Sequence, residues 1–479
     1  MGVKLPTQPA STSATRERVD SKLLFGELTL IMSKRDHIPG DPEFSSLRDL
    51  SDGAKLAQKL QQHLASFGAG EKFNVASCTV EQVHAKPGGG LRLLFTAHMQ
   101  TPGADTPFAQ MYFGRLLRER KDETHTAALL RARLVAPRFG PPVLFVPEWS
   151  LLLWAYPNDP NLAGLPLLLD HAQVLNRMQA APEKFGFAAA PTVVTSELTK
   201  YVPGMRCGYI FRVQFPEGGT AAVYGKAYQD GQGARAFNIM QQIWQSPACR
   251  RGDLLLPQPY SYDAENDIIW QQALSGQAFA KVADWGENLP PVAGEIGRRL
   301  AAYHGLAMDL PCEKTLAFQV EEVRHAVVSM QKVFPIFAER CRALGERLMQ
   351  TAAGLENGPV TPLHVSFKFS HVFATPAGLA FIDFDGASLG DPGYDVGRFL
   401  AHLYKMKADW KIDPNIAGAA AANFCAAYNR AAAAPLTQTR MDWFAASHLI
   451  GSQVYKSIKR VDTGPVNKLL KIAEQLCPP

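Results

Sequence analysis

The stretch from Leu363 to Leu403 constrains the fold and function of this chain more than any other part of the sequence. Two short apolar strands are predicted on either side of a tight turn at Thr375 to Gly378, and the second strand runs from Leu379 to Phe384. Asp383 and Asp385 stand at the exit of this second strand. Carboxylates at the end of a buried hairpin suit a hard cation such as magnesium, which takes one or two of them and completes its shell with phosphate oxygens and water.

This acidic pair is open to two interpretations. Asp383 and Asp385 either bind a metal ion or cap the strand end and pair with a nearby base such as Arg398. Two acids in isolation favour the second interpretation. The segment from Gly390 to Asp395 follows at a spacing that resembles the motif of a phosphotransferase family, and this resemblance favours a functional origin of the pair.

The same stretch resembles the aminoglycoside phosphotransferase and choline kinase superfamily. The signature of that superfamily is a His-Gly-Asp loop, an Asn five residues after this Asp, then Ile-Asp-Phe/Trp and Gly-Asp-Pro-x-x-Asp. The matching positions here are His364, Val365, Ser366, His371, Ile382, Asp383, Phe384, Gly390, Asp391, Pro392 and Asp395. The resemblance implies an α+β, bilobal, protein-kinase-like fold of the aminoglycoside phosphotransferase type, with ATP and magnesium as cofactors.

The resemblance also implies a role for each position. In the superfamily the loop Asp orients or deprotonates the acceptor hydroxyl, the Asn helps to hold magnesium, and the next Asp coordinates magnesium on the nucleotide phosphates. Ser366 and His371 occupy the first two places, so only Asp383 remains of the three groups. Asp385 is a second candidate metal ligand, and His364 is implied to be a structural member of the loop. Asp391 and Asp395 are likewise implied to be structural.

The segment from Thr192 to Ala280 has the order expected for the small lobe of that superfamily. It contains three β-rich runs, Thr192 to Tyr201, Met205 to Gln214 and Thr220 to Tyr228. Lys226 lies near the end of the third run, where the resemblance implies the lysine that contacts nucleotide phosphates. A lone lysine on a strand is otherwise a solvated side chain.

The helix predicted at Ala234 to Trp244 lacks an acid. A kinase-like fold orients its lysine with a helical Glu, so here Asn238 or Gln242 would be a weaker hydrogen-bond partner for Lys226. The segment from Asp267 to Gly276 then reads as a strand that runs into a hinge, similar to the linker whose backbone meets adenine. The nucleotide-binding candidates in this linker are Trp270, Gln272 and Ala273.

An internal repeat is also predicted. Lys86 to Ala97 parallels Val202 to Val213, and the segment that ends at Arg115 parallels the one that ends at Lys226. The run that ends at Trp154 echoes the run that ends at Trp270. The sequence therefore predicts a second unit like a small lobe, without a large lobe of its own and with Arg115 at the lysine position. Chance similarity between two antiparallel meanders is the alternative.

At 479 residues and 47% hydrophobic, the chain is long enough for several folding units. The predicted order is a disordered polar tail at 1–21, an N-terminal α+β unit resembling a kinase small lobe at 22–169, and a connecting helix and linker at 170–191. A kinase-like small lobe follows at 192–280, and a mostly helical large lobe carries the degenerate loop at 281–479.

Charge and cysteine content limit the partners and the compartment. The formal net charge of +5 is spread without a basic block, so nucleic acid is not an expected partner. Seven scattered cysteines without CxxC spacing argue against a disulfide framework or a zinc site and favour a cytoplasmic location. No secretory signal is recognised, and the apolar runs are too short to span a bilayer.

Three functions are consistent with this sequence. The first is a pseudokinase that binds nucleotide with magnesium but lacks the catalytic Asp, because Ser366 stands there, and the Asn, because His371 stands there. The second is an ATP-dependent phosphotransferase with a rearranged site that acts on the hydroxyl of a small-molecule acceptor. The third is a scaffold that binds no nucleotide and contacts a protein partner through the N-terminal unit.

Overall fold

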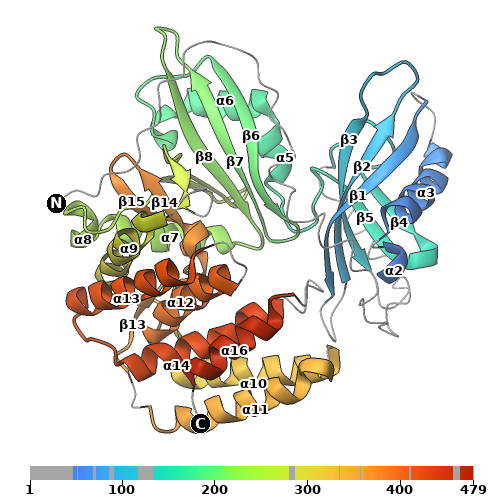
Figure 1. The fold of residues 1–479 in the computed structure, drawn as a ribbon. Coiled ribbons are helices and arrows are strands. Elements are labelled where there is room, and N and C mark those ends of the chain that lie inside the picture. Colours follow the sequence, from blue (N-terminus) through green and yellow to red (C-terminus); the bar gives the residue numbers. More distant parts are fainter. Residues whose placement is uncertain are drawn as a thin grey trace.

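The structure is a computed structural model and describes residues 47–50, 52–67, 72–85, 91–116, 134–279, 286–333, 335–355, 358–408, 412–456 and 464–477. The tail predicted at 1–21 and the turn predicted at 86–90 lie outside the described residues. Two five-stranded antiparallel sheets stand next to each other, and one of them lies against a mostly helical part of the chain (Figure 1). The predicted α+β class is therefore confirmed.

The N-terminal sheet has the strand order β1-β2-β3-β5-β4. Its strands are β1 (Asn74–Ala85), β2 (Leu91–Gln100), β3 (Phe108–Leu116), β4 (Val143–Val146) and β5 (Leu151–Ala155). The short helix α2 (Leu47–Leu50) precedes α3 (Gly53–Leu64), which packs on one face of the sheet. Asp52 caps α3 by accepting from the backbone N–H of Ala54 at 3.0 Å, and Leu56, Leu60 and Leu64 repeat at four-residue spacing, so the buried side of the helix is apolar.

The central sheet has the order β6-β7-β8-β10-β9. Its strands are β6 (Val193–Val202), β7 (Arg206–Gln214), β8 (Thr220–Tyr228), β9 (Pro259–Asp263) and β10 (Ile268–Gln272). One face packs on α5 (Leu165–Leu169) and α6 (His171–Ala180), and α7 (Gln232–Trp244) follows β8 on the other face. The strands, the connecting helix and α7 thus lie where the sequence predicts them.

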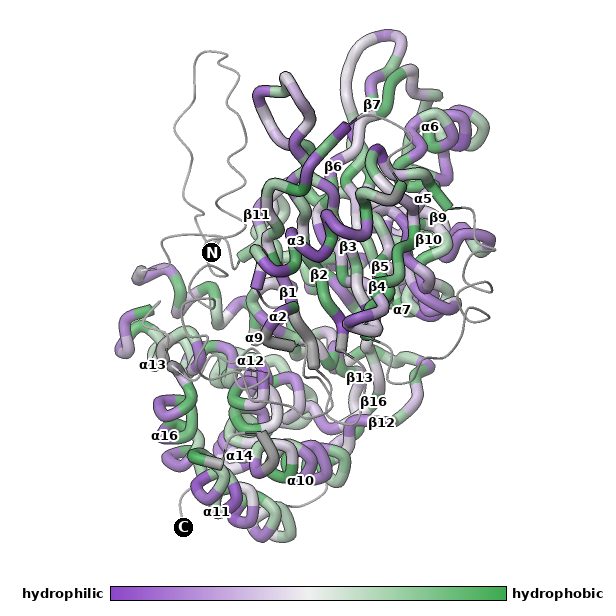
Figure 2. Tube along the Cα trace, turned by 90° about the vertical axis from the view of Figure 1, so that its right-hand side faces the viewer, coloured by the Kyte–Doolittle hydropathy of each residue, from purple (hydrophilic) through white to green (hydrophobic). Residues whose placement is uncertain are grey.

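The helical part follows the central sheet. Its longer helices are α9 (Leu289–His304), α10 (Leu316–Val333), α11 (Pro335–Ala352), α12 (Gly393–Ala408), α13 (Pro414–Ala431), α14 (Gln438–His448) and α16 (Val466–Leu476), with a π-helical segment at Leu449–Val454. Hydrophilic and hydrophobic segments alternate along α10 and α11, as expected for helices with one face on a core (Figure 2). No described helix is both long and apolar enough to cross a membrane.

Two small sheets bring the signature segment together inside the helical part. The hairpin of β14 (Val372–Thr375) and β15 (Gly378–Phe381) is extended by β11 (Gln277–Ala278). The second small sheet orders β12 (Cys312–Lys314), β16 (Ser388–Gly390) and β13 (Thr361–Leu363). The predicted hairpin is therefore present, and β13 and β16 hold the two ends of the segment that contains the loop and the acidic pair.

The N-terminal and central sheets share their strand order and part of their register. Leu94 of β2 lies opposite Phe113 of β3, and at the matching positions of the central sheet Ile210 lies opposite Tyr224. These pairs align Arg115 with Lys226, as the predicted repeat requires. Arg115 is exposed.

The next strand pair corrects one predicted correspondence. Gly114 lies opposite Leu153, whereas Gly225 lies opposite Trp270. The position equivalent to Trp270 is therefore Leu153, and the predicted match with Trp154 is off by one residue. Because side chains alternate between the two faces of a strand, this shift turns Trp154 to the other face of its sheet.

The segment after β5 fastens the N-terminal sheet to the turn between β6 and β7. The buried carboxylate of Asp159 accepts hydrogen bonds from Gly204 N at 2.7 Å and from Tyr201 Oη at 2.8 Å. Asn161 donates to the carbonyl oxygen of Gly204 at 3.2 Å. Gly204 has a φ of +67°, which glycine adopts without strain. Leu94 adds an apolar contact by joining the hydrophobic cluster of the central sheet.

We expect Asp159→Ala to lower the free energy of unfolding by about 2 kcal/mol, because it leaves buried donors of Gly204 and Tyr201 without an acceptor. Urea denaturation measures this change. The thiol of Cys207 is buried close to the hydroxyl of Tyr156, so its labelling by a thiol reagent should become faster in the variant.

The matched control for this prediction is Asp105→Asn, in an exposed turn of the N-terminal sheet. Its unfolding free energy should stay within about 0.5 kcal/mol of the parent protein. Equal effects of the two substitutions would show that Asp159 does not hold the turn.

Candidate functional site

Three basic side chains lie on one face of the central sheet, the face that meets the helical part. Lys200 of β6 lies opposite Gly208 of β7, which in turn lies opposite Lys226 of β8. Directly paired residues share a face of a sheet, and Arg206 shares it too because it lies two residues before Gly208. Cys207 points to the other face, where it joins the hydrophobic cluster under α5 and α6.

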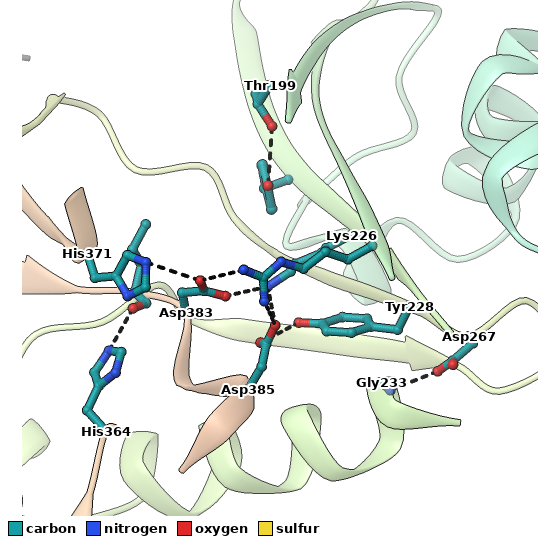
Figure 3. A network of polar contacts seen from close by, with 12 residues as sticks. Thr199, Lys226, Tyr228, Gly233, Asp267, His364, His371, Asp383 and Asp385 are labelled. Atoms are coloured by element: carbon teal, nitrogen blue, oxygen red, sulfur yellow. Dashed lines mark hydrogen bonds and ion pairs between the residues drawn. The ribbon is translucent and has the colours of Figure 1, made fainter. Parts of the chain in front are cut away.

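Two carboxylates meet these bases from the helical part. Asp383 and Asp385 follow β15, and a short 3-10 turn at Phe384–Gly386 carries the chain on to β16. Asp383 has a left-handed backbone with a φ of +68°, a conformation that is uncommon for residues other than glycine and is found at functional sites and turns. The backbone bend sets both carboxylates toward the central sheet (Figure 3).

Lys226 and Arg206 each bridge both carboxylates. Lys226 Nζ donates to Asp383 Oδ1 at 2.8 Å and to Asp385 Oδ2 at 2.7 Å (Figure 3). Arg206 Nη1 donates to Asp385 Oδ2 at 2.9 Å, and its Nη2 donates to Asp383 Oδ2 at 3.2 Å. Tyr228 Oη donates a hydrogen bond to Asp385 Oδ1 at 2.8 Å. These contacts form an ion cluster, defined here as Arg206, Lys226, Asp383 and Asp385, that joins the central sheet to the helical part.

The ion cluster is electrostatically strong because it is mostly shielded from water. Burial alone would raise the pKa of Asp383, but the charges of Lys226 and Arg206 hold that pKa well below its usual value. Burial would lower the pKa of Lys226, yet Asp385 and Asp383 raise it well above its usual value. The stabilising effect of ionised Asp383 is present above the pKa of an unfolded aspartate, about 4, and is lost as the pH falls through the lowered value.

The partners of the acidic pair and of Lys226 differ from two predictions. Arg398 was the expected base under the structural interpretation of Asp383 and Asp385, but the pairing bases are Lys226 and Arg206. Gln242, predicted as a substitute partner of Lys226, instead accepts from the backbone of Asp309 at 3.1 Å.

The predicted substitute Asn238 is also not a partner of Lys226 among the described residues. The Lys226 ammonium is held by carboxylates of the helical part, so α7 does not have to orient it. Arg235 is the only lysine or arginine of α7, and it contacts the helical part by donating to the carbonyl oxygen of Ala387 at 2.8 Å.

His371 contacts Asp383 from within the helical part. Its Nε2 lies 3.3 Å from Asp383 Oδ2, and its Nδ1 is buried with no partner among the described residues. Burial and the neighbouring ring of His364 lower its pKa, so the imidazole is neutral at physiological pH. The neutral ring therefore lies against Asp383 without adding a charge to the ion cluster.

The loop at His364 to Ser366 is held by Asp395. The fully buried carboxylate of Asp395 accepts from His364 N at 2.6 Å and from Val365 N at 2.9 Å, and it lies 3.3 Å from His304 Nε2. Val365 has a φ of +66°, a strained conformation for a β-branched residue, and it stands where the superfamily has glycine. Asp395 thus keeps the loop in its bent form even though the glycine is missing.

Ser366 is close to this site but has no activating base. Its backbone N–H donates to the carbonyl oxygen of His364 at 2.7 Å, and no described residue makes a hydrogen bond to its hydroxyl. The ring of His371 is committed to Asp383. A serine hydroxyl without a neighbouring base is neither a general base nor an activated nucleophile at neutral pH.

The three nucleotide-binding candidates of the predicted linker lie in different surroundings. The indole of Trp270 is buried against Phe185 and Phe211 on the face under α5 and α6, so it is unable to stack on a ligand at the ion cluster. Gln272 is exposed, and its backbone N–H donates to the carbonyl oxygen of Gln258 at 2.8 Å. Ala273, which follows the strand, is half-buried. Gln272, at the end of β10, is thus the exposed one of the three candidates.

Two further carboxylates support the elements around the site. Asp391 forms an ion pair with Arg440 in the interior of the helical part, and it accepts from Gly393 N at 2.9 Å at the start of α12. Asp267 accepts from Gly231 N at 2.7 Å and from Gly233 N at 3.0 Å, and so holds the first turn of α7 (Figure 3).

Several site residues were missed from the sequence. Arg206, Tyr228, Lys200 and Lys368 were not singled out, although Arg206 follows directly on a Pro-Gly turn and Tyr228 lies two residues after Lys226 on the same face of β8. That spacing is the available signal for Tyr228. Lys368 has no such local signal, because its importance depends on the charges gathered around it.

The residues present do not fit magnesium in this arrangement. Each oxygen of Asp383 and Asp385 already accepts from an ammonium, a guanidinium or a phenol. No group of three or more His, Cys, Asp or Glu among the described residues is arranged to hold a metal ion. The predicted magnesium site at Asp383 and Asp385 therefore stays a prediction that requires both cations to leave.

The sequence comparison finds a family that part of the chain resembles. Residues 212–439 match the phosphotransferase enzyme family, a segment that runs from β7 to α14 and includes Lys226 and the acidic pair. This match confirms the predicted resemblance to the aminoglycoside phosphotransferase and choline kinase superfamily. No curated protein matches the chain.

The solved structures to which the chain is similar are distant from it in sequence. A putative aminoglycoside phosphotransferase from Ralstonia eutropha JMP134 is 14% identical over 64% of this chain and 98% of its own, with a TM-score of 0.44. Choline kinase LicA from Streptococcus pneumoniae is 12% identical over 64% of this chain and 97% of its own, with a TM-score of 0.41. A thermostable mutant of aminoglycoside phosphotransferase APH(4)-Ia, in ternary complex with ADP and hygromycin B, is 14% identical over 62% and 95%, with a TM-score of 0.41.

The ion cluster generates a prediction on stability. Lys226→Met and Asp383→Asn should each lower the free energy of unfolding by about 3 kcal/mol, because each removes one of the two partners of a largely buried charge. The double variant should lose less than the sum of the two, by at least about 1 kcal/mol. Chemical denaturation of all four proteins measures the coupling. Additive losses, within about 0.5 kcal/mol, would show that the two groups do not interact.

Lys368 generates a prediction on reactivity. Burial and the positive charge of Lys200 lower the pKa of Lys368 to about 8, whereas the pKa of Lys226 is raised. The unprotonated amine is the nucleophile, so at pH 8 Lys368 should react with an acylating reagent much faster than Lys226. Mass spectrometry of partially labelled protein ranks the two sites, and Lys368→Arg confirms the assignment. Faster labelling of Lys226 would contradict the charge arrangement described above.

Proposed function

We propose that this protein is a pseudokinase of the phosphotransferase enzyme family that binds a nucleotide where the central sheet meets the helical part. Support comes first from the family match over residues 212–439, whose relatives include a protein solved with ADP. Support also comes from Lys226, which lies on the strand and face where the superfamily has its phosphate-contacting lysine. The phosphate oxygens of the nucleotide would replace the carboxylates as partners of Lys226 and Arg206.

One observation gives the main support for the proposed loss of catalysis. Ser366 stands at the position of the catalytic Asp and has no base within hydrogen-bond distance among the described residues. General base assistance contributes about 10²- to 10⁴-fold, so its loss slows transfer without abolishing it alone. His371 at the Asn position is committed to Asp383, which removes a second group from the reaction.

ATP is expected to raise the melting temperature of the purified protein without being consumed. A ligand at a hundredfold excess over its dissociation constant stabilises a folded protein by about 2.7 kcal/mol, which is readily seen as a thermal shift. Phosphate release and transfer to a panel of hydroxyl acceptors should not exceed the background of Asp383→Ala. Turnover by the parent protein that Asp383→Ala abolishes would establish the alternative, an active phosphotransferase for a small molecule.

The variant Ser366→Asp with His371→Asn separates these two functions further. It replaces both missing groups at the positions where the superfamily has them. A rearranged but active enzyme should keep or gain turnover in this variant, whereas the pseudokinase should gain little while Arg206 holds both carboxylates. No thermal shift with ATP in any variant would favour the scaffold function.

We further propose that residues 22–169 are a second copy of the small lobe. The identical strand order of the two sheets, and the matching register that aligns Arg115 with Lys226, support this proposal. Arg115 is exposed and forms no ion pair with a carboxylate of the described residues. The N-terminal unit would therefore serve as a surface for a protein partner rather than as a nucleotide site.

A cytoplasmic location also stays a prediction, and all seven cysteines are free thiols.

A further inference from the structure

The carboxylates that would bind magnesium are neutralised by the protein itself. Lys226 and Arg206 bring two positive charges to the two negative charges of Asp383 and Asp385, at distances from 2.7 to 3.2 Å. The side chains of Lys226 and Asp383 are only 11% and 13% exposed, so water screens these contacts weakly. Inside the ion cluster the charges are therefore balanced.

Two more cations lie next to this balanced cluster. Lys200 lies on the same face of the central sheet as Lys226, opposite Gly208. Lys368 follows the Ser366 loop on the side of the helical part. Burial lowers its pKa, and so do the charges of Lys200, Arg398 and Arg206, whereas Asp383 raises it. No described carboxylate lies within ion-pair distance of Lys200 or Lys368. The junction as a whole thus carries about two more positive charges than negative ones.

A surplus of positive charge selects an anion and disfavours a metal ion. A divalent cation would have to displace Lys226 and Arg206 from the carboxylates. It would then add positive charge to a region that already has a surplus of positive charge. A polyphosphate instead supplies the missing negative charge, and its oxygens accept from lysine and from both edges of an arginine guanidinium. His371, which lies 3.3 Å from Asp383 as a neutral ring, does not change this balance.

We propose that the site binds a polyphosphate, such as the triphosphate of a nucleotide, without a divalent metal. Lys200, Arg206, Lys226 and Lys368 supply the positive charge that magnesium supplies in an active enzyme. This inference rests on the proposed nucleotide-binding function and adds the ionic form of the ligand. It also explains how loss of the Asn position is compatible with binding, because no metal has to be held there.

Isothermal titration of the full chain with ATP tests the proposal, once in excess EDTA and once in excess magnesium. ATP in EDTA carries more negative charge than its magnesium complex, so binding in EDTA should be equal or tighter. Tripolyphosphate should compete with ATP in EDTA, because the phosphates are the part that the cations recognise. A low salt concentration sharpens the difference, since screening weakens these contacts.

Variants assign the binding to the cations. Arg206→Met and the double change Lys200→Met with Lys368→Met should each weaken ATP binding in EDTA about tenfold or more, the effect of losing a charge-assisted hydrogen bond. Arg212→Met is the matched control on the same strand, because Arg212 forms only an exposed pair with Glu197 at 3.4 Å. Asp383→Asn should tighten binding, because it frees Lys226 and Arg206 for the phosphates.

The outcomes separate this inference from the function on which it rests. Binding that is at least about tenfold tighter with magnesium, and that Asp383→Asn abolishes, would overturn the inference and leave the nucleotide-binding function in place. No binding of ATP or tripolyphosphate under either condition would overturn both. The double lysine variant keeps the test valid if Arg206→Met fails to fold, because Lys200 and Lys368 make no ion pair with a described residue that folding would lose.

Discussion

One lysine and one arginine that share two carboxylates hold the central sheet against the helical part. Lys226 and Arg206 come from neighbouring strands, and Asp383 and Asp385 come from a single turn after β15. Four oriented contacts between two rigid elements determine how those elements sit relative to each other. The same four side chains would have to rearrange to admit a phosphate or a metal. The contacts that join the central sheet to the helical part and the contacts that would bind a ligand thus require the same charged side chains.

This shared requirement gives the two acids a role that does not depend on a catalytic base. Removing one partner of a largely buried ion pair costs about 3–5 kcal/mol, because the remaining charge stays without compensation. Asp383 is therefore tied to stability as well as to any ligand. Ser366 contacts no described side chain by a hydrogen bond, so no comparable cost is attached to it. Asp395 similarly holds the strained Val365 backbone through two hydrogen bonds.

The sequence predicted those parts of the site that depend on local patterns. The β14–β15 hairpin, the position of the acidic pair and the strand of Lys226 each follow from residues within a few positions of one another. Arg206 was missed because its partner Asp383 lies 177 residues away, and nothing near it in the sequence indicates that contact. Trp270 was placed on the correct strand but not on the correct face. Strand parity decides the face, and a shift of one residue reverses it.

The turn between β6 and β7 contacts the N-terminal part of the chain and also leads into the ion cluster. Its Gly204 is bound by Asp159, which belongs to the segment after the N-terminal sheet, and Arg206 begins β7 two residues later. The hydrogen bond from Gly204 therefore places the backbone two residues before the guanidinium that contacts both carboxylates. One short turn thus determines both where the N-terminal sheet is attached and where the strand that carries Arg206 begins.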